Sequence, residues 1–265
     1  MSVSELYPPH SAVVSALRSA GCVFAEDEAV LLVSAARDRG ELAAMVERRV
    51  IGLPLEHVLG WAEFHGRRMA VDPGVFVPRR RSEFLVDRAL ALAPPRPVVV
   101  DLCCGSGALG AAVLHTLGAG ELHAADIEPA AVRCARRNVE PVGGRVYEGD
   151  LYAPLPGRLA GRVDVLIANA PYVPSGEIGL LPPEARDHEP LVALDGGADG
   201  LDIQRRVTAQ ARRWLAPGGA LLIETSGRQA PRTEAAFTGH GLGARVAVCE
   251  ERDATVVIGT RPDDG

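Results

Sequence analysis

The sequence has few of the residues that would build a metal centre or a disulfide framework. Its five cysteines include no CxxC pair, and their odd number and wide spacing suit neither disulfide pairing nor a zinc site. The seven histidines show no HxxxH or HExxH spacing, so we expect no bound metal. This cysteine usage is typical of a protein of the reducing cytoplasm, where we expect it to reside.

Long apolar runs are also missing. No stretch reaches the roughly 18 to 20 residues that a membrane-spanning helix needs, and the first ten residues lack the basic end and apolar segment of a signal peptide. The net charge of −6 would repel the phosphate backbone of a nucleic-acid duplex. We therefore expect no membrane association and no direct nucleic-acid partner.

What is present is an ordered succession of amphipathic segments, with 47% hydrophobic residues in a chain of 265. Residues 1–54 carry apolar residues at helical spacing and predict a small helical domain. Residues 55–80 contain short apolar pieces broken by glycine and proline, which favours a hairpin or linker. In residues 81–265 strand-like runs alternate with helix-like runs. This alternation predicts βαβ units and a parallel sheet covered by helices on both faces.

Several element boundaries follow from the same reading. Residues 25–40 and 41–50 are expected to form two helices. A third helix is expected over residues 200–219, ending at Pro217-Gly218-Gly219, with a strand over 220–225 behind it. The final strand-like runs, 244–250 and 254–260, can pair as an antiparallel edge of the sheet.

A glycine-rich loop follows the first predicted strand of the second half. Asp101 ends that strand, and Cys103, Cys104, Gly105, Ser106 and Gly107 lead into an alanine-rich helix. Such a loop lets a nucleotide-like ligand approach the backbone closely. The pattern DxxxGxG alone is weak, because dinucleotide-binding proteins and many structural turns share it.

Acidic residues that end the next two predicted strands strengthen the prediction of a nucleotide-like ligand. Asp126 stands where a carboxylate can accept both ribose hydroxyl groups of an adenosine, although it can also cap the helix that begins near Pro129. Asp150 ends the third strand in the same manner. NAD remains a competing ligand at this stage, because it uses the same fold and the same ribose carboxylate.

The fourth predicted strand ends in Asn169-Ala170-Pro171-Tyr172. An amide or aryl amino nitrogen is a poor nucleophile, because its lone pair is delocalised. A site that accepts hydrogen bonds from both N–H groups, through the Asn oxygen and a following backbone carbonyl, directs the lone pair at a methyl donor. Proline would stiffen the segment and Tyr172 would pack on the planar group. A plain strand-ending turn is the alternative reading of these four residues.

The tetrapeptide resembles the (D/N/S)-P-P-Y motif of amino-methyltransferases, and two longer segments narrow the resemblance. PLEHVLGWAEFHGRRMAVDPGVFVPRRRSEFLVDRAL is similar to the interdomain linker of protein-glutamine N5-methyltransferases of the HemK/PrmC type, which later reads IPRPDTE. HEPLVALDGGADGLD is similar to the F/HEPxxALxGGxDGL segment of the same family. The resemblance covers nearly the whole chain.

The resemblance implies a class I S-adenosylmethionine-dependent methyltransferase domain, which is Rossmann-like with a seven-stranded sheet and an antiparallel edge. It also implies a small N-terminal helical domain that docks a protein substrate, and a monomeric protein. The methyl acceptor would be a glutamine of the GGQ loop of a release factor or of a ribosomal protein. By position, Asp101 and Cys103 to Gly107 would form the cofactor loop, Asp126 with Ile127 would hold the ribose, Asp150 and Leu151 would flank adenine, and Asn169 to Tyr172 would hold the glutamine amide.

The sequence departs from the family pattern at three places. Ala170 replaces the first proline of the tetrapeptide, while Pro171 still restricts Ala170 to extended geometry. Cys103 replaces a glycine, a change that is free of strain only where φ is negative. Arg80, Arg81 and Ser82 replace the middle of IPRPDTE, and the run Arg79 to Arg81 can be a solvated face, an anion site or a partner contact.

These departures leave other functions open. A nucleic-acid amino-methyltransferase would share the tetrapeptide and act on a flipped base, although the acidic charge and the HEPLVALDGGADGLD segment argue against it. An N-methyltransferase of a small metabolite is a second alternative. A non-catalytic methyltransferase-like subunit is a third.

Overall fold

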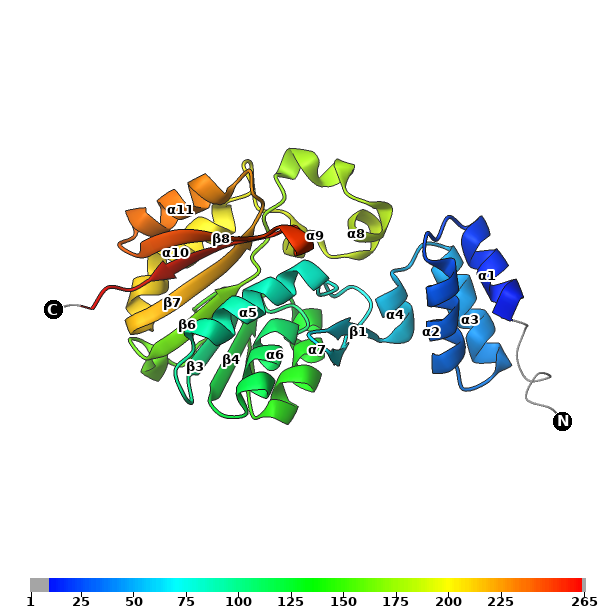
Figure 1. Cartoon of the computed structure of the whole chain (residues 1–265), viewed down its shortest axis with the longest axis horizontal. Coiled ribbons are helices and arrows are strands. Elements are labelled where there is room, and N and C mark those ends of the chain that lie inside the picture. Colours follow the sequence, from blue (N-terminus) through cyan, green and yellow to red (C-terminus); the bar gives the residue numbers. More distant parts are fainter. Residues whose placement is uncertain (1–9, 264–265) are drawn as a thin grey trace.

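The computed structural model describes residues 10–263 of the chain. Residues 1–9, the start of the predicted helical domain, and residues 264–265, the end of the predicted methyltransferase domain, lie outside it. The helices α1 (His10–Ser19), α2 (Ala25–Ala35) and α3 (Arg39–Val50) pack around a core of their own. They lie at one end of the molecule, opposite the C-terminus (Figure 1).

A short helix and a hairpin connect this helical unit to the rest of the chain. Helix α4 (Leu55–Leu59) leads into the antiparallel strands β1 (Trp61–Phe64) and β2 (Arg67–Ala70). The side-chain amide of Asn138 holds β2 in place: its Oδ1 accepts from Ala70 N at 2.8 Å and its Nδ2 donates to Ala70 O at 2.9 Å. The hairpin expected within residues 55–80 is therefore present, fixed to a helix of the second half.

The second half contains one seven-stranded sheet with the order β5-β4-β3-β6-β7-β9-β8. The first five strands of this order run parallel, whereas β9 pairs antiparallel with both β7 and β8. The predicted antiparallel edge is thus confirmed. The elements are α5 (Glu83–Leu92), β3 (Val98–Leu102), α6 (Ala108–Leu117), β4 (Glu121–Asp126), α7 (Pro129–Val139), β5 (Arg145–Glu148), β6 (Val163–Ala168), α10 (Asp202–Trp214), β7 (Leu215–Thr225), α11 (Ala230–Gly239), β8 (Gly243–Cys249) and β9 (Ala254–Thr260).

Helices cover both faces of the sheet because successive strand residues point to opposite faces. Val99 of β3 belongs to the hydrophobic cluster formed with α5, α6 and α7. Its neighbours Val98 and Val100 belong to the cluster formed with α10 and α11. Figure 1 shows the sheet between these two layers. This is the class I methyltransferase fold, with the small helical unit at its N-terminal end.

The structure corrects several predicted boundaries. The N-terminal region contains α1 in addition to the two expected helices, and α2 ends at Ala35 rather than at residue 40. Helix α10 ends at Trp214, before the proline-glycine turn, because Leu215 already pairs with Val163 of β6. Strand β7 therefore begins five residues earlier than the predicted 220–225. Across residues 10–263, no helix has the length and apolar character needed to cross a membrane.

The segment between β6 and α10 contains the HEPLVALDGGADGLD sequence and forms a separate cap at the edge of the sheet (Figure 1). It consists of a 3-10 turn over Ser175–Leu180, α8 (Pro183–His188), α9 (Leu191–Leu194) and a glycine-rich return. Arg49 of α3 joins this cap to the helical unit, since it contacts Glu28 of α2 at 2.6 Å and Glu184 of α8 at 2.8 Å.

Candidate functional site

A cavity opens at the edge of the sheet where the carboxyl ends of the neighbouring strands β4, β3 and β6 meet. Ligands of open parallel sheets bind at this edge, where the loops diverge. All predicted cofactor residues except Asp101 and Gly107 line this first cavity. Its lining includes Val75, Phe76, Cys103, Cys104, Gly105, Ser106, Asp126, Ile127, Asp150, Leu151, Asn169 and Pro171.

The glycine loop turns sharply after β3 because three of its residues have left-handed backbone angles. Gly105 has a φ of 54°, Gly107 of 72° and Cys103 of 54°. A Cβ at Gly107 would lie 2.7 Å from Cγ2 of Val139, so α6 can approach α7 this closely only with glycine there. Cys103 does not meet the condition of negative φ, and it carries the strain of an L-residue in this region.

Asp101 lies beneath the loop. Its Oδ2 accepts a hydrogen bond from the backbone N–H of Gly110 at 2.9 Å, and the residue is buried. Burial raises the pKa of this carboxyl group to about 7. Asp101 therefore anchors the first turn of α6 to β3, and its direct contact with a cofactor stays a prediction.

Asp126 joins the ends of β3 and β4 and also faces the first cavity. Its Oδ2 accepts from Gly105 N at 2.8 Å, and its Oδ1 accepts from Glu128 N at 2.9 Å. Burial raises the pKa of this carboxyl group, while the two N–H donors act in the opposite direction. The N-cap of α7 is Glu128 rather than Asp126, so Asp126 holds the residue that precedes the helix.

Asp150 and Leu151 lie on the far side of the first cavity. The carboxylate of Asp150 forms an ion pair with Arg206 of α10, which places a second helix at the rim. Leu151 has a φ of 49° and is buried. Together with Ile127, which is exposed after β4, Leu151 gives the cavity apolar walls around its acidic groups.

Asn169 separates the first cavity from a second one. It lines both, as do Phe76 and Ala193. The Nδ2 of Asn169 donates to Oγ of the buried Ser82 at 3.4 Å, which leaves Oδ1 available as an acceptor. Of the remaining tetrapeptide residues, Ala170 and Tyr172 line the second cavity, whereas Pro171 lines the first. The tetrapeptide is therefore the boundary between two adjoining spaces.

Tyr172 is held at its hydroxyl group by a pair of charged residues. Arg81 donates from Nη2 to the hydroxyl oxygen at 2.6 Å and from Nε to Glu224 at 3.2 Å. The hydroxyl group itself donates to Glu224 at 3.4 Å. Burial, together with Glu224, raises the pKa of Tyr172 to about 12, so this hydroxyl stays protonated near neutral pH.

A second arginine-carboxylate pair lines the second cavity. Arg79 donates to Glu189 at 2.6 Å, and Glu189 also accepts from Val77 N at 3.1 Å. Among residues 10–263, Oε2 of Glu189 and Oε2 of Glu224 are buried without a hydrogen-bond partner. The run Arg79 to Arg81 thus divides: Arg79 and Arg81 line the second cavity, whereas Arg80 does not.

Sequence reasoning did not assign Ser82, Glu189, Glu224 or Arg81 to the site. Glu224 carried a usable signal, because it lies near the end of a strand in the same way as Asp101 and Asp126. Arg81, Ser82 and Glu189 belong to segments that only the family resemblance had singled out.

The first cavity suits an adenosine-type ligand. The carboxylate of Asp126 can accept hydrogen bonds from ribose hydroxyl groups, and the apolar side chains of Ile127 and Leu151 can flank a flat ring. Glycine at position 105 leaves the loop open on this side, since a Cβ there would meet no atom closer than 4.0 Å. A group bound here would reach Asn169 and hence the second cavity.

Comparison with known proteins decides the family. Residues 67–179 match the family model described as methyltransferase small domain. The chain is 38% identical to the release factor glutamine methyltransferase of Geobacter sulfurreducens over 76% of this chain and 72% of that protein. The chain belongs to the HemK/PrmC-type methyltransferase family. S-adenosylmethionine is accordingly the cofactor of this chain.

Two other relatives of this chain are named for different methyl acceptors. It is 41% identical to the ribosomal protein uL3 glutamine methyltransferase of Burkholderia pseudomallei, over 74% of this chain and 67% of that protein. It is 36% identical to the 4-amino-L-phenylalanine/4-methylamino-L-phenylalanine methyltransferase of Streptomyces pristinaespiralis, over 74% of this chain and 69% of that protein.

A solved structure agrees with the fold. The methyltransferase of Pyrococcus furiosus superposes with a TM-score of 0.56 at 16% identity, covering 74% of this chain and 90% of that chain. This likeness concerns the architecture of the sheet and its helices.

Proposed function

We propose that this enzyme methylates the side-chain amide nitrogen of a protein glutamine, in the GGQ loop of a release factor or in a ribosomal protein. The observation that carries the proposal is the position of Asn169, which lines both the first cavity and the second. An amide held in the second cavity against Asn169 faces the cofactor directly. Two relatives named for glutamine methylation support this acceptor.

The residues of the tetrapeptide prepare the acceptor nitrogen. Oδ1 of Asn169 accepts a hydrogen bond from one N–H of the amide, and the carbonyl of Ala170 accepts from the other. With both N–H groups held, the nitrogen lone pair is directed at the first cavity. The ring of Tyr172 packs on the planar amide, and its hydroxyl is fixed by Arg81 and Glu224. Orientation thus supplies most of the catalysis.

When bound, S-adenosylmethionine supplies an electrophilic methyl group on a positively charged sulfonium. Asp126 would hold the ribose of the bound cofactor through its carboxylate, which faces the first cavity. The nitrogen becomes acidic as it is methylated, so its proton can leave to solvent or a nearby acceptor. We assign no general base and no metal, and among residues 10–263 no cluster of metal-ligating side chains exists.

The N-terminal domain, for which we propose the bounds 1–54, docks the protein substrate beside the second cavity through its small helical unit, with residues 55–80 as linker and 81–265 as the methyltransferase domain. Arg49 supports this role, because it ties the unit to Glu184, which lines the second cavity. We further propose that the enzyme acts as a monomer in the cytoplasm and binds no nucleic acid directly.

A labelling experiment tests the acceptor. The purified enzyme is incubated with methyl-labelled S-adenosylmethionine and a bacterial lysate, and labelled peptides are located by mass spectrometry. We expect label on a glutamine of a release factor or ribosomal protein. Label confined to nucleic acid, or cofactor binding with no label at all, would overturn the proposal.

A small aryl amine is the second candidate acceptor. The relative from Streptomyces pristinaespiralis, named for 4-amino-L-phenylalanine, favours it, since an aryl amine also has a delocalised lone pair. Label that appears in low-molecular-weight material instead of protein would select this candidate while leaving the cofactor and fold in place.

A further inference from the structure

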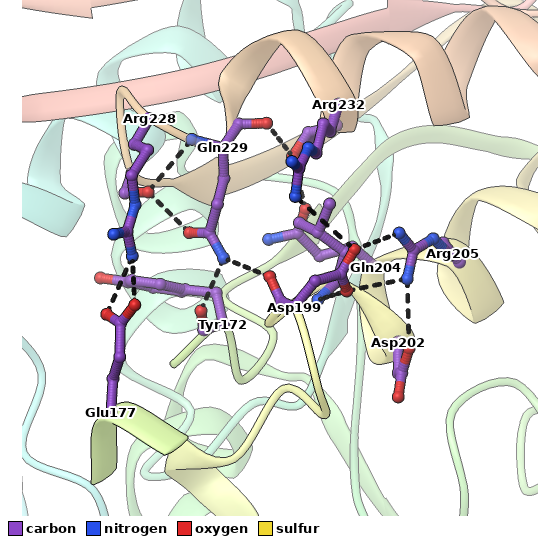
Figure 2. A network of polar contacts seen from close by, with 12 residues as sticks. Tyr172, Glu177, Asp199, Asp202, Gln204, Arg205, Arg228, Gln229 and Arg232 are labelled. Atoms are coloured by element: carbon purple, nitrogen blue, oxygen red, sulfur yellow. Dashed lines mark hydrogen bonds and ion pairs between the residues drawn. The ribbon is translucent and has the colours of Figure 1, made fainter. Parts of the chain in front are cut away.

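The side-chain amide of Gln229 joins three segments that are far apart in the sequence. Its Nε2 donates to the carbonyl oxygen of Tyr172 at 2.9 Å and to the carbonyl oxygen of Asp199 at 3.1 Å. Its Oε1 accepts from the hydroxyl group of Ser226 at 2.6 Å. Gln229 is 5% exposed, and Figure 2 shows its amide between Tyr172 and Asp199. Both N–H groups and the oxygen of this amide are therefore used.

The glycine-rich return is the loop of residues 196–200, and it packs directly against the backbone of the tetrapeptide. A Cβ at Gly200 would lie 2.3 Å from the carbonyl oxygen of Tyr172, and a Cβ at Gly196 would lie 2.7 Å from that of Pro171. Val173 N donates to Leu194 O at 3.0 Å, and Val173 O accepts from Gly196 N at 2.9 Å. The GGADG sequence thus permits a backbone-to-backbone contact that side chains would prevent.

Gln229 holds these two segments together, because its Nε2 donates to the tetrapeptide at Tyr172 and to the glycine-rich return at Asp199. Tyr172 is consequently held at both ends: at its hydroxyl group by Arg81 and Glu224, and at its carbonyl by Gln229. The tetrapeptide here has alanine at position 170, where a proline would restrict the chain by itself. Pro171 still restricts Ala170, and the rigidity that a proline at position 170 would add must come from residues around the tetrapeptide.

We propose that Gln229 is a positioning residue for methyl transfer. It acts through the backbone of Tyr172 and keeps the Asn169 side chain and the Ala170 carbonyl aimed at the acceptor amide. This role rests on the proposed function, since it presupposes that those two oxygens hold an amide. Gln229 itself touches neither the first cavity nor the second, so it is not a catalytic residue.

The test compares Gln229→Leu with Thr233→Val. Leucine is an apolar side chain of similar size, although it branches one atom earlier than glutamine, and it removes all three side-chain hydrogen bonds. Thr233 lies one turn further along α11, is fully buried, and donates to Gln204 at 2.7 Å without touching the tetrapeptide. With a release factor as substrate, we expect Gln229→Leu to lower kcat at least tenfold with little change in cofactor affinity. Thr233→Val should keep kcat within about twofold of the wild type.

Two further measurements separate positioning from general loss of structure. Adding Ala170→Pro to Gln229→Leu should recover part of the lost kcat, because proline restricts the same backbone. Independently of any acceptor, hydrogen exchange in residues 170–176 should be faster in Gln229→Leu than in Thr233→Val.

The outcomes are distinct. A wild type that methylates no glutamine of a release factor or of a ribosomal protein defeats the proposed function, and hydrogen exchange then decides the role of Gln229. Equal exchange in the two variants would overturn the positioning role. So would equal kcat in the two variants at equal folded fraction. Should Gln229→Leu not fold, Gln229→Met takes its place with the same expectations.

Discussion

The carboxylate of Asp126 accepts a hydrogen bond from the backbone N–H of Gly105 at 2.8 Å, which ties the end of β4 to the glycine loop after β3. The same carboxylate faces the first cavity. One side chain therefore shapes the loop and also faces the cavity, where we propose that it accepts hydrogen bonds from the ribose.

Replacing Asp126 tests this dual role. Asp126→Ala should weaken S-adenosylmethionine binding by roughly 1.5 to 3 kcal/mol, the scale of hydrogen bonds to a charged acceptor. Isothermal titration calorimetry measures this directly. Asp27→Ala, an exposed acid on α2, is the control and should leave the affinity unchanged. An unaltered dissociation constant in Asp126→Ala would refute the ribose assignment.

Asn169 should matter to turnover rather than to cofactor binding. Asn169→Ala removes the Oδ1 acceptor, and loss of one such oriented group typically costs about a hundredfold to a thousandfold in rate. Single-turnover kinetics with saturating S-adenosylmethionine would show this loss, while titration should give a dissociation constant near that of the wild type. If activity survives the substitution, the amide is not held as proposed.

Arg49 is expected to stabilise the helical unit strongly, because Glu28 is buried against it. Arg49→Leu leaves that carboxylate without its partner, which typically costs about 3 to 5 kcal/mol. The double variant Glu28→Leu with Arg49→Leu should recover much of this loss in urea unfolding. A double variant no more stable than Arg49→Leu alone would mean that the buried pair is not the source of the effect.

The raised pKa of Asp101 predicts a pH dependence of stability. The folded chain binds this proton up to about pH 7, whereas the unfolded chain releases it near the ordinary value of 3.8. The contribution of Asp101 to stability therefore falls as pH rises between these values and stays low above them, by up to about 4 kcal/mol.

Asp101→Asn cannot ionise and isolates this contribution. Its unfolding free energy, relative to the wild type, should increase from about pH 5 to about pH 8 in urea titrations. A difference that stays constant over this range would show that Asp101 titrates at the same pH in both states.

The sheet and the cofactor edge could be predicted because their signals are local. Asp101, Asp126 and Asn169 each stand at or next to the end of an apolar run, and the strands behind them form where the alternation indicated. The boundary of α10 could not be predicted this way. Pro217 is a strong helix terminator, but pairing of Leu215 with Val163 ends the helix earlier.

The polar contacts that hold the tetrapeptide could not be predicted from the sequence, because they join residues that are far apart in the chain. Arg81 and Glu224 are separated by 143 residues, and Tyr172 and Gln229 by 57. Nothing in the local pattern of either member indicates its partner, since each is an ordinary polar residue near the end of an element. The sequence therefore could not show that Arg79 and Arg81 line the second cavity whereas Arg80 does not.

The most direct test of the central claim uses a purified release factor and a version in which the glutamine of its GGQ loop is replaced by asparagine. Each is incubated with the enzyme and S-adenosylmethionine, and the methylated residue is located by tandem mass spectrometry. The account predicts one methyl group on the side-chain nitrogen of that glutamine and none on the replaced factor. Equal methylation of both factors would contradict it, and so would methylation of neither factor when ribosomal proteins incubated in the same way also gain no methyl group on glutamine.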